Sequence, residues 1–351
     1  MFIFYFMCAY IFMVFFVAIL HAFLGPYLKK YDKYIEKDKK YWEKSHESCT
    51  AKNNYNLSAR ELNKLKKPQM LNAFYDFYSE RPREEFVKLL SANKNQIVEL
   101  GRKYKSTTVR AYFAYVLCSF KIEESKLNSG LTDLMLEYIL DNSVYARENA
   151  LKALYSFGNA RKVCEAFCVL SKKDIYHSEK LLADGLLTFS GDVENLSYLL
   201  MTNFKELVEC YQVAVINYLS YKNEYGYNDI LIEYMEREEC SLDVKCRILR
   251  ILGKEKGSRN KRILMKSVEQ YLNATEWELA SVAAGALGGY DKDKKVEELL
   301  CHALTSRNWY VRINSAKSLI RISASDDSMQ QILSGEDKYA KDALMYAMNN
   351  K

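Results

Sequence analysis

The stretches DNSVYARENALKAL (141–154) and SRNWYVRINSAKSL (306–319) decide the fold of this 351-residue chain. Each begins with a polar turn and continues into a run of small, branched and large apolar residues that ends in Leu. Apolar residues spaced at i, i+3, i+4 and i+7 are typical of an amphipathic helix. Both stretches therefore predict a turn followed by a helix with one buried face.

The same pattern recurs along the chain. Clear copies start at Val109, Ala146, Val244, Leu279, Val311 and Ala340, and weaker ones start at Ser178 and Tyr211. The period is about 33 residues, which is the length of one helix pair in a repeat protein. The chain also has only 3 prolines, and strand-like alternation is hard to find. We predict an all-α fold of about eight repeat units within residues 58–351.

These copies resemble the HEAT repeat family, specifically the short-period repeats also seen in phycobilin lyase subunits. The resemblance covers about residues 84–351 and rests on the polar turn and the Val-Arg-x-x-Ala-x-x-x-Leu core. It implies an α-α superhelix, a HEAT-like (armadillo-like) α-solenoid in which each helix pair buries its apolar face against its neighbours. The copies at Ser178 and Tyr211 depart from the pattern because they lack the basic residue. HEAT-like proteins include transport receptors, phosphatase scaffolds, bilin lyases and a class of DNA glycosylases, so the resemblance implies a fold and leaves the function open.

A basic residue follows the first apolar position in five copies: Arg110, Arg147, Lys245, Arg312 and Lys341. One interpretation is a row of phosphate-binding residues. The other is an internal ladder that caps the turns between helices, with nearby acids such as Asp141, Asp243 or Glu148 as partners. We favour the ladder, because equivalent positions in stacked repeats face equivalent turns.

The variable positions of the second helix in each unit are the better candidates for protein binding, since these helices usually line the concave face. Three pairs lie one turn apart on that face: Asn149 with Lys152, Arg247 with Arg250, and Asn314 with Lys317. A solvated helix face explains the same residues equally well. Trp277 and Trp309 precede two consecutive second helices, either as recognition residues or, as we favour, as fillers of the grooves between repeats.

Residues 1–28 contain no Asp, Glu, Lys or Arg. A run of about 24 apolar residues forms a helix of roughly 36 Å, enough to cross a hydrocarbon core of about 30 Å. A cleaved signal peptide would instead show a basic start, a shorter apolar run and a small-x-small cleavage site, and these are absent. We therefore predict a single-pass anchor in the cell membrane. The basic flank places the N-terminus outside and the repeat domain in the cytoplasm.

Residues 29–57 form the predicted juxtamembrane segment. It begins with six lysines that we call the basic collar: Lys29, Lys30, Lys33, Lys37, Lys39 and Lys40. Aromatic residues recur among these charges after Pro26, which is well placed to start a helix at the interface or a stalk. Residues 45–56 lack apolar periodicity and are predicted to be a linker, with the body beginning near residue 58.

The charge distribution excludes one class of partner. Residues 27–67 hold 12 basic and 6 acidic residues, an excess equal to the whole-chain net charge of +6, so the rest of the chain is neutral. A duplex-binding domain carries its basic excess on the folded body. We expect no nucleic-acid partner. The collar either attracts anionic lipid headgroups or only fixes topology and solvates the segment.

Searches for chemistry find no catalytic, cofactor-binding or metal site and no evident small-molecule substrate. The 4 His are far apart in sequence, Cys164 and Cys168 lie in an apolar stretch, and no nucleotide, hydrolase or zinc motif occurs. The 9 Cys form an odd set without a CxxC pair, which suits a reducing compartment.

The sequence thus predicts a membrane-anchored cytoplasmic scaffold without enzymatic activity. It would bind or regulate a protein partner, such as a membrane-associated enzyme or transport complex. Two alternatives stay open: a HEAT-type enzyme, either a lyase or similar to a DNA glycosylase, and an extracytoplasmic structural module, which requires a signal peptide.

Overall fold

The computed structural model describes residues 2–122, 129–290 and 293–350, without the side chains of residues 2–4, 27–32 and 129. All regular elements in these ranges are helices, and no strand occurs in them. The chain is therefore all-α, as predicted. It divides into two compact units: Met1–Ala166 with Phe189–Asp192 (unit 1), and Phe167–Thr188 with Val193–Lys351 (unit 2).

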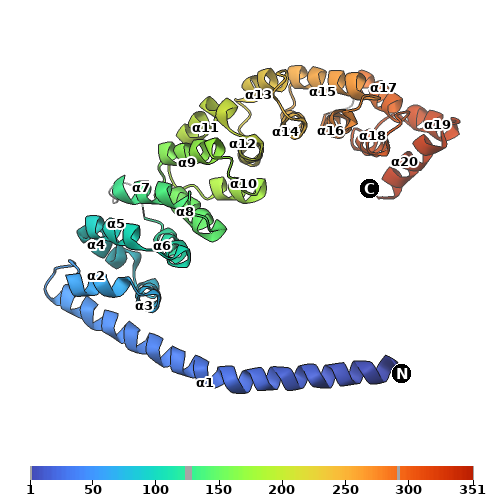
Figure 1. Cartoon of the computed structure of the whole chain (residues 1–351). Coiled ribbons are helices and arrows are strands. Elements are labelled where there is room, and N and C mark those ends of the chain that lie inside the picture. The colour runs from blue at the N-terminus through green and yellow to red at the C-terminus, as the bar shows by residue number, and fades with distance from the viewer. Residues whose placement is uncertain (1, 123–128, 291–292, 351) are drawn as a thin grey trace. The chain divides into compact units, whose positions relative to one another are not determined.

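Unit 1 opens with one long helix, and shorter helices follow it (Figure 1). Its helices are α1 (Phe2–Ala51), α2 (Ala59–Leu65), α3 (Pro68–Ser79), α4 (Arg83–Ala92), α5 (Lys94–Lys103), α6 (Thr107–Ser119), α7 (Ser129–Tyr138), α8 (Val144–Phe157) and the start of α9 (Ala160–Lys172). Helix α3 packs on α6, and α6 packs extensively on α8. We call α3, α6 and α8 the second helices of unit 1.

Unit 2 continues the same arrangement with helix pairs. Its elements are the end of α9, α10 (Glu179–Leu187), α11 (Val193–Thr202), the 3-10 helix η2 (Phe204–Glu206), α12 (Glu209–Lys222), α13 (Asn228–Met235), α14 (Leu242–Leu252), α15 (Ser258–Tyr271), α16 (Trp277–Leu287), α17 (Lys294–Ala303), α18 (Trp309–Arg321), α19 (Asp326–Ser334) and α20 (Lys338–Asn349). The even-numbered members, from α10 to α20, pack on one another in sequence and are the second helices of unit 2. Figure 1 shows α14, α16 and α18 end-on in a row alongside α13, α15 and α17.

The predicted repeat register is confirmed. Seven of the eight motif copies start inside a second helix, and the eighth start, Ser178, is the N-cap of α10. Leu154 in α8 and Leu319 in α18, which the motif places at equivalent positions, are both fully buried. The two weaker copies follow the same register, because burial of the apolar face defines it even where the basic residue is missing.

Polar residues of the predicted turns cap three of the second helices, α14, α18 and α20. The side-chain oxygen of Asn308 accepts a hydrogen bond from the N–H of Tyr310 at 2.8 Å, and Asp337 accepts one from Ala340 at 3.0 Å. These bonds satisfy backbone donors that a helix N-terminus leaves without partners. A polar residue of the turn therefore marks the start of α14, α18 and α20, whereas α6, α8, α10, α12 and α16 begin without such a side-chain hydrogen bond.

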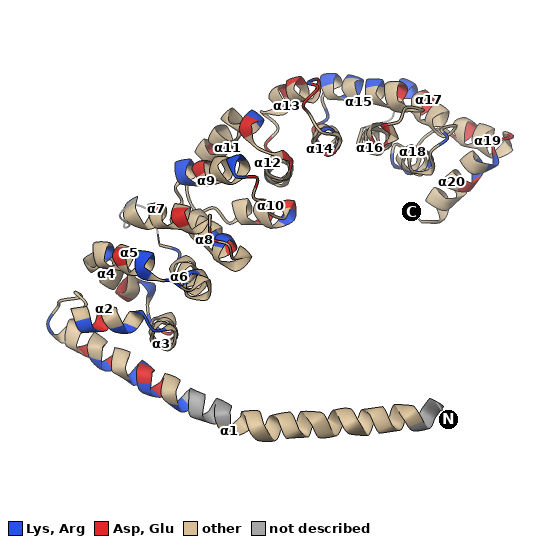
Figure 2. Cartoon of the chain, in the orientation of Figure 1, with Lys and Arg blue, Asp and Glu red and all other residues tan. Residues whose placement is uncertain are grey.

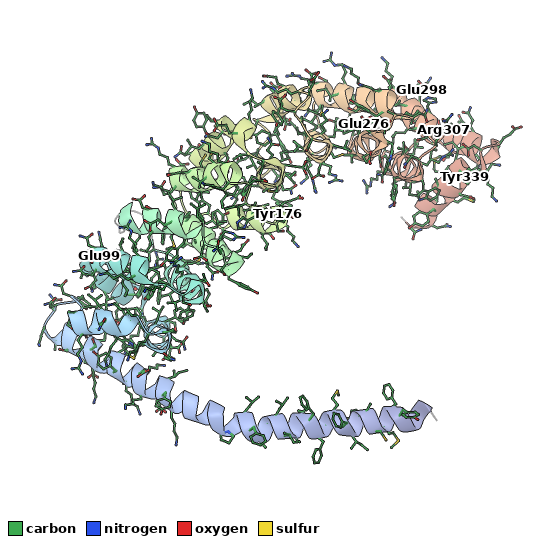
Figure 3. All side chains as sticks on the ribbon, viewed as in Figure 1. Glu99, Tyr176, Glu276, Glu298, Arg307 and Tyr339 are labelled. Carbon is green, nitrogen blue, oxygen red and sulfur yellow. The ribbon has the colours of Figure 1, made fainter. Side chains whose placement is uncertain are left out.

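The N-terminal half of α1 carries apolar side chains around its whole circumference. Within the described ranges, Tyr5–Pro26 is the one helical segment that is long and apolar enough to cross a membrane. None of its residues is buried. A signal sequence near an N-terminus can also meet this criterion of length and apolar composition. Side chains project from this half without another element packed on it (Figure 3), and it carries no charged residue (Figure 2). The helix start expected at Pro26 is wrong, since Pro26 lies inside α1.

The C-terminal half of α1 belongs to the folded body. It packs on α3, with Trp42, His46 and Cys49 buried. The predicted linker at 45–56 is therefore wrong for residues 45–51, which are helical. The three buried residues are spaced i, i+4 and i+7, a narrow stripe of which His46 and Cys49 lie within the predicted linker.

Candidate protein-binding groove

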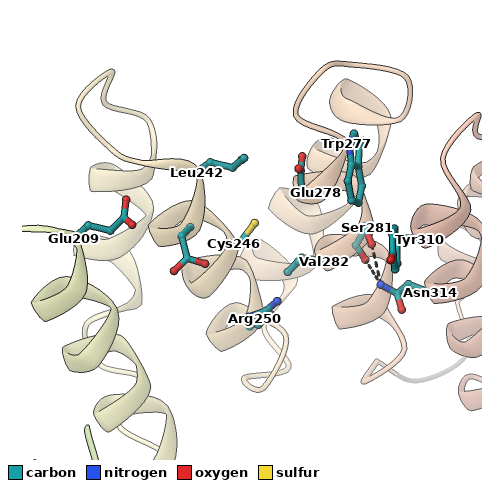
Figure 4. A pocket seen from close by; sticks show the side chains of 11 residues that line it. Glu209, Leu242, Cys246, Arg250, Trp277, Glu278, Ser281, Val282, Tyr310 and Asn314 are labelled. Atoms are coloured by element: carbon teal, nitrogen blue, oxygen red, sulfur yellow. Dashed lines mark hydrogen bonds between the residues drawn. The ribbon is translucent and has the colours of Figure 1, made fainter. Parts of the chain in front are cut away.

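A groove of about 620 Å³ lies on the second helices of unit 2 (Figure 4). Its walls come from α14, α16 and α18, and Glu209 at the start of α12 closes one side. The lining combines an aromatic pair, several carboxylates and one arginine. We call it the α14–α18 groove.

The aromatic wall joins two neighbouring repeats. The rings of Trp277, the first residue of α16, and Tyr310, the second of α18, are stacked with centroids 5.5 Å apart and planes 13° apart. Tyr310 is 60% exposed, so the stack also offers a surface to a partner. Trp277 thus fills the space between repeats, as favoured, and lines the groove as well. Trp309 is 44% exposed and is not part of this wall.

The floor of the groove contains a bridge between second helices. The amide of Asn314 donates to the carbonyl oxygen of Ser281 at 3.2 Å and to its hydroxyl at 2.9 Å (Figure 4). In unit 1 the equivalent Asn149 donates to the carbonyl oxygen of Ala111 at 2.9 Å. Both asparagines therefore hold adjacent second helices together. This structural role was not part of the prediction, which treated them as protein-binding residues.

Carboxylates gather at the end of the groove where the second helices begin. Asp243 and Glu278 lie in the first turns of α14 and α16, and Glu209 lies in the first turn of α12. Asp243 is 3.5 Å from the guanidinium of Arg247. Glu278 forms no ion pair within the described residues, and its Oε2 is buried there without a hydrogen-bond partner. Acidic residues at a helix N-terminus are favourable on their own, but among the described residues neither Glu209 nor Glu278 has a cation paired with it.

The opposite end of the groove is basic. A neighbouring hollow of about 380 Å³ shares Arg250 and Asn314 with the groove and adds Lys254 and Arg321. These cations lie at the C-terminal ends of α14 and α18, where the helix dipole favours positive charge. The two ends of the surface are therefore opposite in sign.

Cys246 forms part of the groove wall between these ends. Burial raises the pKa of its thiol to about 11, although the positive charge of Arg250 acts to lower it. A thiol with this pKa is protonated at neutral pH and is a poor nucleophile. Cys246 contributes an apolar surface to the groove.

The predicted binding pairs fall in different surroundings. Lys152, Arg250 and Lys317 are exposed, whereas Arg247 is held by Glu179 at 3.3 Å. Because Arg247 already has acidic partners, Arg250 is the member of this predicted pair that is available to a binding partner. Of the six predicted residues, Arg250 and Asn314 line the α14–α18 groove.

The repeated basic residues form the predicted ladder at Arg110 and Arg312. Arg110 donates to the carbonyl of Tyr104 and to Asp141, each at 2.8 Å. Arg312 makes the same two contacts, to the carbonyl of Ser306 and to Asp337, the latter at 2.7 Å. These arginines cap turns between helices and are not free to bind phosphate.

Arg147 caps its turn through backbone carbonyls, with no acidic side chain paired to it in the described part of the chain. It donates to the carbonyls of Asp141 at 2.8 Å and Asn142 at 3.2 Å. At Lys245 and Lys341 the ladder stays a prediction, and Lys245 lines a hollow that α13 and α15 also form.

The basic collar divides into exposed and paired lysines. Lys33, Lys37 and Lys40 are exposed, although Lys40 also contacts Glu36 at 3.0 Å, while the side chains of Lys29 and Lys30 lie outside the described residues. Lys39 forms an ion pair of 2.5 Å with Glu80, which follows α3. Part of the collar thus contributes to packing of α1 on the body.

Sequence reasoning missed three lining residues whose motif position was visible. Asp243, Glu278 and Tyr310 each stand immediately before the first apolar residue of a motif copy. A comparison of that position between three consecutive copies shows an acidic residue in the first two and an aromatic residue in the third. No group of three or more His, Cys, Asp or Glu side chains within the described ranges is arranged to hold a metal.

Comparison with known proteins supports a HEAT-like repeat family. The sequence profile described as HEAT repeats matches residues 264–349, which run from α15 to α20. A crystal structure of an engineered protein from the Northeast Structural Genomics Consortium shares 13% identity over 83% of this chain and 87% of that chain. Its TM-score is 0.33, which is too low to show a shared fold. No curated protein sequence matches the chain.

Proposed function

We propose that this chain is a non-enzymatic scaffold that docks a protein partner in the α14–α18 groove while α1 holds it at a membrane. The observation that carries the proposal is the groove itself. It joins three consecutive second helices and exposes an aromatic stack together with both signs of charge. Aromatic residues and arginine are the side chains that most often anchor protein interfaces.

The membrane part of the proposal rests on the continuity of α1. Its first half is apolar on all sides, and its second half is packed on α3 within the same helix. A helix of this kind would keep the repeat body close to the bilayer, so membrane proteins are the partners that it meets most often. The positive flank supports a cytoplasmic body and a partner such as a membrane-associated enzyme or transport complex.

The groove also supports a binding role over a catalytic one. Its thiol is protonated at neutral pH because burial raises its pKa. The arginines repeated at the turns are engaged with backbone carbonyls and carboxylates. Neither a nucleophile with its base nor a phosphate-binding row is supported by these contacts.

Site-directed photo-crosslinking in native membranes tests the proposal. A benzophenone amino acid replaces Val282 in the groove or, as the matched control, Glu269, which is exposed on α15. We expect a discrete adduct from position 282 that a Tyr310→Ala change removes, and no such adduct from position 269. Equal adducts from both positions, or none from 282, would contradict the proposal.

A further inference from the structure

We infer that the acidic end of the α14–α18 groove binds the guanidinium group of an arginine in an extended segment of the partner. This inference rests on the proposed function, because it assigns a chemistry to the partner that docks there. Three features support it: a carboxylate without a partner, an aromatic wall beside it, and a change of sign along the groove.

The first feature is the state of Glu278. Its Oε2 is buried and has no hydrogen-bond partner within the described residues. A buried acceptor without a donor is costly, and more so when it carries charge. The neighbouring Asp243 differs, because Arg247 approaches it at 3.5 Å. The Glu278 side chain as a whole is half-buried and lines the groove, so within the described residues it is a groove carboxylate that no cation of this chain pairs with.

The second feature is the wall next to this carboxylate. Trp277 precedes Glu278 directly in α16, and its ring is stacked with the exposed ring of Tyr310 (Figure 4). A planar guanidinium stacks on aromatic faces and can at the same time donate two hydrogen bonds to a carboxylate. A lysine ammonium provides a point charge and lacks the planar face, so the geometry favours arginine.

The third feature is the local charge. Among the described residues that line the groove, Glu209, Asp243 and Glu278 are acidic and Arg250 is the one cation. The whole chain has a net charge of +6, so a basic segment is not attracted to the protein as a whole. Binding of an arginine must then come from this local field.

Selection from a random library of twelve-residue peptides tests this inference. The full chain is held in nanodiscs of phosphatidylcholine, a zwitterionic lipid that does not attract basic peptides. Selection is run on the unchanged chain, on Glu278→Gln and Tyr310→Leu variants, and on Glu269→Gln and Trp309→Leu as matched controls. Circular dichroism melting checks that each variant is folded.

We expect arginine-containing peptides from the unchanged chain and from both controls. For the strongest peptide, replacing arginine by citrulline, which keeps the shape and removes the charge, should weaken binding about tenfold in fluorescence anisotropy. The same replacement should have little effect on the Glu278→Gln variant, because the charge partner is already lost.

The outcomes separate the inference from the proposed function. Peptides that lack arginine, or that bind equally well with citrulline, but lose binding in Tyr310→Leu would overturn the inference and leave the groove as a docking surface. If no peptide is selected, or if binding does not depend on Tyr310 or Glu278, both the inference and the docking groove fail.

Discussion

The indole N–H of Trp42 in α1 donates a hydrogen bond of 3.0 Å to the backbone carbonyl of Met70 in α3. The ring of Trp42 is 1% exposed and meets Phe74 edge-on at 4.9 Å. The helix that carries the apolar N-terminal residues is thus joined to the repeat body through a buried aromatic contact. The first packed helix of the body is the second half of α1.

The first prediction concerns this junction. In a shortened chain that begins at residue 33, Trp42→Ala should lower the free energy of unfolding by about 3–5 kcal/mol, because a large buried ring and its hydrogen bond are lost. Urea denaturation followed by circular dichroism measures the change, with exposed Lys37→Ala as the control. A chain that begins at residue 58 and unfolds with the same stability would contradict the role of α1.

The second prediction concerns the repeat core. Leu154 and Leu319 are fully buried at equivalent motif positions in the two units. Leu→Ala at either position should cost about 2–5 kcal/mol of unfolding free energy, owing to lost burial and the cavity left behind. The same urea experiment measures it, with Leu187→Ala on the exposed side of α10 as a control. Losses near zero at both positions would show that the register is wrong.

The third prediction concerns pH. Burial raises the pKa of Asp337, but hydrogen bonds from Arg312 and from the N–H of Ala340 outweigh it and hold the pKa below the ordinary 3.8. A carboxylate with a lowered pKa in the folded state stabilises the protein above pH 3.8, and this stabilisation is lost as the pH falls through the folded-state pKa.

Asp337→Asn should therefore destabilise the shortened chain at pH 7, and the difference from the unchanged chain should shrink below pH 3.8. Urea titrations at pH 7, 5 and 3 measure this. The exposed Asp184→Asn on α10 is the control. A difference that is the same at all three pH values would rule out the ion pair as the cause.

The fourth prediction concerns the basic collar. Changing Lys33, Lys37 and Lys40 to Gln should weaken binding of a chain that begins at residue 27 to phosphatidylserine vesicles about tenfold or more, because each lysine near an anionic surface contributes about 1 kcal/mol. Lys39 stays unchanged since it pairs with Glu80.

Vesicle flotation measures the binding, and a matched loss of charge at the exposed residues Lys172, Lys173 and Lys180 is the control. Equal weakening by both triple changes would mean that only net charge matters. In that case the collar has no special position at the membrane.

The repeat pattern predicted the second helices because each must bury an apolar face against two neighbours, which forces a regular spacing. The same criterion failed at α1, where Trp42, His46 and Cys49 form a stripe too narrow and too polar to be recognised. Of the residues that line the groove, the sequence singled out only Arg250, Asn314 and Trp277 as candidates for binding. The importance of Glu278 and Tyr310 depends on the distance between adjacent helices, which the sequence alone does not give.

The central claim is that a folded repeat body is held at a membrane by its own first helix. Alkaline carbonate extraction of membranes, with a reporter fused after Lys351, tests it most directly. The account predicts that the full-length chain stays in the membrane pellet with its reporter in the cytosol, and that deletion of residues 2–26 releases a folded chain. Release of the undeleted chain by carbonate, or its recovery as a shortened soluble species, would contradict the account.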